Sequence, residues 1–181
     1  MDPIQLFDPA SGTYTYILCD EASREAVVID PVAEQLDRDT ATLDSLGAKA
    51  VWVLETHAHA DHVTSAARLA ELTGARLAAP AGCNIGTAAV QLNDGDTVPF
   101  GGEHLRVLHT PGHTAGAVCY HWLRQGADPQ DAPPASEDDA VELGHELRPD
   151  LRHDAQHVFT GDTLLIQGCG RTDFQSGDAG Q

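Results

Sequence analysis

Positive charge is scarce in this sequence. Its 181 residues include one lysine, Lys49, and only 10 lysines and arginines together, against 28 aspartates and glutamates. The formal net charge is −18 when the histidines are neutral. Because a surface of this sign repels other polyanions, we expect neither nucleic acid nor an anionic membrane as a partner.

Long apolar segments and closely spaced cysteines are also absent. No run approaches the roughly 20 apolar residues that a membrane-spanning helix needs. Residues 1–4 lack a basic region followed by an apolar core, so we predict no secretory signal and a cytoplasmic location. The four cysteines form no CxxC pair, which favours reduced thiols. The length and an apolar content of 41% suit one domain, 1–181, with a buried core.

The first third of the chain predicts a hairpin, a helix and a buried strand. Two β-rich runs, 13–19 and 25–30, are separated by a polar turn, which is typical of an antiparallel hairpin. Residues 34–46 carry leucines at helical spacing, and Gly47 is well placed to end that helix. The apolar run 50–55 then predicts a buried strand.

Farther along, helix and strand patterns alternate. We predict a helix over 63–72 that ends near Gly74. Short strands are predicted at 76–79, 105–108, 117–122 and 158–160. This order favours an α/β layered domain with a mixed sheet. Residues 124–156 hold four prolines, many acids and little apolar periodicity, which indicates a surface insertion.

Three histidines and an aspartate follow the strand at 50–55 within seven residues. They are His57, His59, Asp61 and His62. A tight loop at a strand end can direct several side chains to one point. Neutral imidazole is a common ligand for borderline metals, and a carboxylate beside it can add a hard donor or orient a ring. The loop therefore predicts a metal site, with a histidine-rich polar turn as the alternative.

Two further loops carry candidate ligands in similar settings. In the first, Pro111 and Gly112 force a sharp turn after a strand, so that His113 can project from the strand end. In the second, Gly161 and Asp162 follow the strand at 158–160. Because ligands bind at one edge of an open α/β sheet, three such loops form a convergent site if their strands end on that edge.

These three segments resemble the successive metal-binding motifs of the metallo-β-lactamase superfamily. The segments are THAHADH at 56–62, HTPGHTAG at 109–116 and TGDT at 160–163. The resemblance implies an αββα sandwich with mixed sheets and the metal at their open edge. It also implies that the second half of the sandwich is incomplete, because family members continue beyond residue 181. Hydrolases, oxygenases and nucleases share this fold, so it does not fix the reaction.

Residues 159–175 indicate one family within this superfamily, because their GCGRTDF segment closely resembles the persulfide dioxygenase family. That resemblance implies one Fe²⁺ per chain, held by His57, His113 and Asp162. It implies oxidation of glutathione persulfide by O₂ to sulfite and glutathione. Two histidines and one carboxylate leave coordination positions open for substrate and O₂. His59, Asp61 and His62 would then surround the ligands and orient them.

Several alternatives stay open at this point. If His59 instead joins the first metal and Asp61 and His62 bind a second, a glyoxalase II-like thioester hydrolase with two zinc ions is the competing enzyme. A non-catalytic metal-binding module is a third hypothesis, and a homodimer is an open assembly state. Arg171 is a candidate catalytic residue that could hold a substrate carboxylate or the persulfide, or could form a salt bridge to Asp173. We expect Cys169 to be a small buried packing residue.

Overall fold

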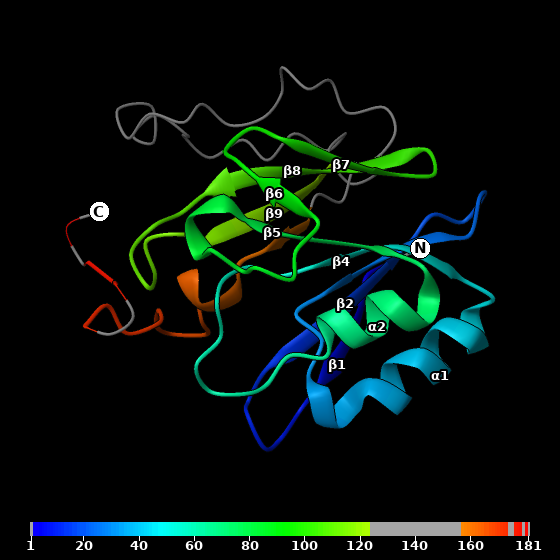
Figure 1. Cartoon of the computed structure of the whole chain (residues 1–181), viewed down its shortest axis with the longest axis horizontal. Helices are drawn as coiled ribbons and strands as arrows, with labels where there is room; N and C mark the ends of the chain where they lie inside the picture. Colours follow the sequence, from blue (N-terminus) through cyan, green and yellow to red (C-terminus); the bar gives the residue numbers. More distant parts are fainter. Residues whose placement is uncertain (1, 124–156, 174–175, 179, 181) are drawn as a thin grey trace, which may run out of the picture.

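Two stacked β-sheets form the body of the protein (Figure 1). A computed structural model describes residues 2–123, 157–173, 176–178 and 180. The larger sheet has the order β1-β2-β3-β4-β5-β6. Its strands are Ile4–Phe7, Tyr14–Cys19, Glu25–Ile29, Lys49–Leu54, Arg76–Pro80 and Val90–Leu92. The first three strands pair antiparallel and the last four pair parallel, so the sheet is mixed as predicted.

The smaller sheet is antiparallel throughout and has the order β10-β9-β8-β7. Its strands, in chain order from β7, are Thr97–Phe100, Glu103–His109, Val118–Leu123 and His157–Phe159. Two α-helices, α1 (Leu36–Leu46) and α2 (Ala66–Thr73), lie on the face of the larger sheet that points away from the smaller one (Figure 1). Short 3₁₀ turns occur at Ala33–Gln35, Ala81–Cys83 and Gly161–Thr163.

Strand alternation explains why the larger sheet is buried on both faces. In β3, Val27 and Ile29 join the core between the sheets, whereas Ala26 and Val28 face the helices. Successive side chains of a strand point to opposite faces, so an uninterrupted apolar run such as β3 suits a sheet that is covered on both sides. The layers agree with the predicted metallo-β-lactamase sandwich. Among the described residues, no α-helix covers the outer face of the smaller sheet.

Most predicted elements are present, with some corrected bounds. The hairpin is β2–β3, and Gly47 ends α1 in the left-handed conformation at φ 57°. The second helix begins at Ala66 and not at residue 63, because the preceding residues pair with the loop after β3. The carbonyl of Val63 accepts the Ala33 amide, and the Ser65 amide donates to the carbonyl of Pro31.

The predicted insertion, 124–156, lies outside the described residues. Within the part of the chain that the structure describes, no helix has the length and apolarity needed to cross a membrane. The loops that carry the predicted site residues follow β4, β8 and β10, and they converge at one end of the sandwich.

Candidate metal centre

The structure brings the three predicted ligands together from three separate loops. One donor atom from each of His57, His113 and Asp162 lies within 4.8 Å of the other two. Asp162 Oδ2 is 3.5 Å from His113 Nε2 and 4.0 Å from His57 Nε2. The two imidazole rings are nearly perpendicular, at 89°, with centroids 4.9 Å apart. This is a compact donor set of two imidazole nitrogens and one carboxylate oxygen.

A hydrogen-bond relay fixes the tautomer of His57. The Thr56 hydroxyl donates to Asp30 Oδ2 at 2.7 Å, so its oxygen is left to accept from His57 Nδ1–H at 2.9 Å. The Nε2 lone pair of His57 therefore points toward Asp162. Burial, together with the nearby His59, lowers the pKa of His57 to about 4, which keeps this ring neutral at physiological pH.

A backbone carbonyl fixes the tautomer of His113. His113 Nδ1 lies 2.8 Å from the carbonyl oxygen of Arg171, and a carbonyl can only accept a hydrogen bond. Nδ1 must therefore carry the proton, and Nε2 offers its lone pair on the side of Asp162. Metal-binding histidines are commonly oriented in this way through their other ring nitrogen.

The remaining predicted residues form a second, adjacent donor set. One donor atom each from His59, Asp61 and His62 also lies within 4.8 Å of the others. His62 Nδ1 is 3.0 Å from Asp61 Oδ1 and 3.2 Å from the Thr13 hydroxyl. Within the described residues, the buried Nε2 of His62 has no hydrogen-bond partner. His59 is the member of this set that lies beside the first set, because its ring centroid is 4.1 Å from that of His57.

Two buried acids beneath the loop are not predicted from the sequence. Asp30 Oδ1 and Glu55 Oε2 each lie 3.2 Å from His59 Nε2. Although burial disfavours the charged ring, Asp30 and Glu55 raise the pKa of His59 well above its usual value. The sequence feature that could have indicated these two acids is their position, directly after the apolar runs that form the adjacent buried strands β3 and β4.

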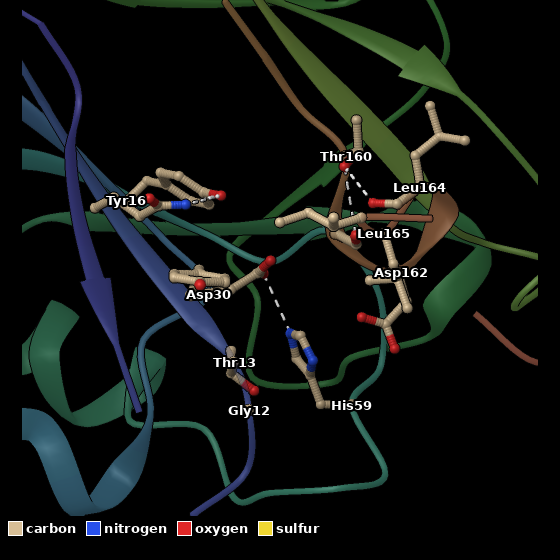
Figure 2. Close-up of a pocket in the computed structure, with 13 residues that line it drawn as sticks. Gly12, Thr13, Tyr16, Asp30, His59, Thr160, Asp162, Leu164 and Leu165 are labelled. Carbon is tan, nitrogen blue, oxygen red and sulfur yellow. Dashed lines mark hydrogen bonds and ion pairs between the residues drawn. The ribbon is translucent and has the colours of Figure 1, made fainter. Parts of the chain in front are cut away.

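Cavities open on two sides of Asp162. One, of about 390 Å³, is lined by Asp30, His59 and Asp162 and by the apolar segment 164–166. Figure 2 shows Leu164 and Leu165 on the side opposite Tyr16, with the Asp30–His59 interaction at the base. The other, of about 520 Å³, is lined by His113, Asp162, Cys169 and Arg171. A molecule could therefore approach the three-donor set from either side.

Arg171 and Cys169 both lie at the surface. The Arg171 side chain is 64% exposed, and its Nε and one terminal nitrogen donate to the two carboxylate oxygens of Asp173 at 2.8 and 3.0 Å. The salt bridge that the sequence offered as an alternative is thus present. The expectation that Cys169 is buried is wrong, because segment 164–169 runs along the surface.

The environment of His57 predicts how the stability of the metal-free protein depends on pH. Because the pKa of His57 falls from 6.5 to about 4 on folding, the unfolded chain binds the extra proton between these values. His57 should therefore cost the native state about 3 kcal/mol as the pH falls from 7 to 4. Denaturant unfolding of the wild type and of His57→Gln over this range checks it. An equal acid dependence in the two proteins would contradict the prediction. The raised pKa of His59 gives a stabilising contribution that is fully present below about pH 6.5 and is lost only as the pH rises above it. Below pH 6.5 the difference between the two proteins therefore comes from His57.

Comparison with known proteins places this chain in a family. A model described as the metallo-β-lactamase superfamily matches residues 13–123. The chain belongs to this superfamily.

Within the superfamily, the predicted resemblance to persulfide dioxygenases is confirmed. The chain is 37% identical over 175 residues to the mitochondrial persulfide dioxygenase ETHE1 of Mus musculus, covering 97% of this chain and 57% of that protein. The crystal structure of ETHE1 from Myxococcus xanthus matches with a TM-score of 0.76 and 39% identity, covering 98% of this chain and 64% of that one. A hydroxyacylglutathione hydrolase of Gloeobacter violaceus is 34% identical over 161 residues, covering 87% of this chain and 51% of that protein. The chain thus spans somewhat more than half of its persulfide dioxygenase relatives.

Proposed function

We propose that this chain carries the iron-binding part of a persulfide dioxygenase. In the proposed reaction, glutathione persulfide, O₂ and water become glutathione and sulfite, with the outer sulfur oxidised and O₂ reduced. The observation that carries the proposal is the donor set of His57, His113 and Asp162. Both of its imidazoles are fixed with Nε2 toward the carboxylate, and cavities open on two sides.

The donor set fits a single ferrous ion. Two histidines and one carboxylate on one face are typical of non-haem iron oxygenases. When bound, ferrous iron would supply adjacent coordination positions for the persulfide sulfur and O₂. The protein supplies orientation, because Thr56 and the Arg171 carbonyl hold the two rings. One Fe²⁺ per chain is therefore the proposed cofactor.

The surrounding residues would serve the substrate and the ligands. Arg171 lines the larger cavity together with His113 and Asp162, so its guanidinium could turn from Asp173 to a glutathione carboxylate or the persulfide anion. Asp61 and His62 would remain unliganded and would adjust the charge around the ion.

Arg171→Ala should therefore separate substrate binding from metal binding. We expect unchanged iron content and about a tenfold higher KM for glutathione persulfide, because a charged hydrogen bond is lost. The exposed Arg68 of α2, paired with Glu71, is the matched control for the same substitution. An unchanged KM in Arg171→Ala would remove the guanidinium from substrate binding, and loss of iron would assign it a structural role.

A glyoxalase II-like thioester hydrolase with two zinc ions is the second candidate. It is favoured by the second donor set, His59, Asp61 and His62, and by the likeness to a hydroxyacylglutathione hydrolase. A dinuclear hydrolase uses its ion pair to activate water. The third hypothesis is a metal-binding module without catalytic activity.

Metal analysis and oxygen uptake distinguish the three functions. The chain is loaded anaerobically with Fe²⁺ or Zn²⁺, desalted and analysed for metal. It is then assayed with glutathione persulfide in an oxygen electrode and with a glutathione thioester. We expect about one iron per chain and iron-dependent O₂ uptake with sulfite formation. Two zinc ions with thioester cleavage would establish the hydrolase, and neither activity at full metal loading would establish the module.

Location and assembly are separate proposals. The mammalian relatives are named as mitochondrial proteins. For this chain we retain a cytoplasmic location, which fractionation of the source cells tests, and a homodimer, which light scattering of the metal-loaded protein tests.

A further inference from the structure

Glu55 is a buried carboxylate to which the proposed reaction assigns no role. It lies between β4 and the metal loop and is 1% exposed. Its Oε1 accepts a hydrogen bond from the Thr64 hydroxyl, and its backbone carbonyl accepts one from the Tyr120 hydroxyl. Burial of a carboxylate is costly unless a partner compensates it. Its other oxygen, Oε2, therefore needs a polarised or charged neighbour.

That neighbour is the Nε2 edge of His59. Glu55 Oε2 and Asp30 Oδ1 are both 3.2 Å from His59 Nε2. One N–H cannot make a well-directed hydrogen bond to both oxygens, and it is the contact with Asp30 that has hydrogen-bond geometry. Among the described residues, Glu55 Oε2 has no hydrogen-bond partner. Its nearest polar neighbour is therefore the His59 ring, 3.2 Å away in a buried setting, where polar groups interact more strongly than in water.

The two acids determine which edge of His59 faces outward. With Nε2 held between Asp30 and Glu55, only Nδ1 remains available, and it lies 4.0 Å from Asp61 Oδ1. The His59 ring is close to His57, with centroids 4.1 Å apart, yet its nitrogens do not join the compact set of His57, His113 and Asp162. His59 is close enough to His57 to become a fourth ligand of a metal bound there. Some contact must therefore hold the His59 ring away from the other three donors.

We infer that Glu55 is a positioning residue that, together with Asp30, holds His59 out of the first donor set and keeps that set at three protein ligands. The inference deepens the proposed function and rests on its ligand assignment. An oxygenase needs coordination positions for both substrate and O₂, and a fourth protein ligand would occupy one of them. Asp30 also accepts the Thr56 amide and hydroxyl, so Glu55 is the acid whose loss acts on His59 with less disturbance of His57.

Co²⁺ is a suitable probe, because its visible absorption reports ligand number and geometry without any turnover. The full chain is loaded with one equivalent of Co²⁺ as wild type, Glu55→Gln, Glu55→Ala, His59→Ala and the Glu55→Ala/His59→Ala double variant. X-ray absorption counts the nitrogen donors in each. Glu71→Gln, an exposed acid of α2, is the control for the loss of one negative charge. Thermal unfolding establishes that each variant is folded, and Glu55→Gln preserves the side-chain shape if Glu55→Ala does not fold.

The expected pattern is specific to His59. Wild type and His59→Ala should give the same cobalt spectrum with two nitrogen donors, since His59 is not a ligand. The Glu55 variants should gain about one nitrogen donor and a changed spectrum, and the Glu55→Ala/His59→Ala double variant should return to the wild-type spectrum. Glu55 variants indistinguishable from wild type, or a wild-type spectrum that changes in His59→Ala, would overturn the inference. O₂ uptake by the iron-loaded wild type decides the reaction independently.

Discussion

Asp162→Ala should lose bound iron on desalting, with an affinity reduced on the order of 100-fold or more. The carboxylate is the single oxygen donor of the first set and lies within 4.0 Å of both proposed ligand imidazoles. Its removal leaves two neutral nitrogens and no charge to balance the cation. Iron content after gel filtration and O₂ uptake with glutathione persulfide measure the loss.

Asp61→Ala is the matched comparison, because it removes a carboxylate from the second donor set only. A mononuclear iron site predicts that Asp61→Ala keeps about one iron per chain and retains O₂ uptake. A dinuclear zinc site predicts instead that Asp61→Ala loses about half of its metal and most of its thioester cleavage. Equal loss of metal in both variants would therefore contradict the mononuclear assignment.

The pattern of strand-end loops predicted which side chains would lie together before their geometry was known. A buried strand followed at once by histidine and aspartate places those side chains at an edge of the sheet, and three such loops supplied His57, His113 and Asp162. Their convergence required the strands to end on the same side. The sheet order provides this, but apolar periodicity gives no information on order. Motif resemblance supplied that information.

The residues that orient the proposed ligands were much harder to predict. Asp30 ends β3 in a left-handed conformation, at φ 50°, and accepts from Thr56 across a parallel strand pair. In the sequence it is an ordinary acid at the end of an apolar run. The support for His113 comes from the backbone carbonyl of Arg171, and side-chain chemistry gives no indication of such a contact. Contacts between loops depend on register and backbone path, which local patterns do not specify.

The same reason explains the shift in the start of α2. The helical pattern continues back to residue 63, but Ala33 and Pro31 bind the backbone of Val63 and Ser65. Long-range pairing therefore overrides local helical preference over one turn. This pairing also joins the end of the metal loop to the segment that follows β3, on which Asp30 lies.

Gly170→Ala should be nearly as damaging to metal binding as the loss of a ligand, although Gly170 has no side chain to coordinate anything. A Cβ at this position would lie 2.6 Å from His113 Nδ1 and 2.6 Å from the Asp162 carbonyl oxygen, closer than packed atoms allow. The Gly170 amide donates to that same carbonyl at 2.7 Å, so the two loops are already in contact. We expect relief of the clash to move either the His113 ring or the Asp162 loop.

Either movement breaks the geometry that points His113 Nε2 toward Asp162 Oδ2. We expect iron affinity to fall 10- to 100-fold, the range found when the supports of a metal ligand are removed. Gly168→Ala is the matched control, because a Cβ there meets nothing within 4 Å. Equilibrium iron titration of both variants, with thermal unfolding of the metal-free proteins beside it, checks the prediction. Equal iron affinity in the two variants would mean that the loop yields without moving His113. A selective loss in Gly170→Ala would show that close packing of two loops keeps the imidazole in position to bind iron.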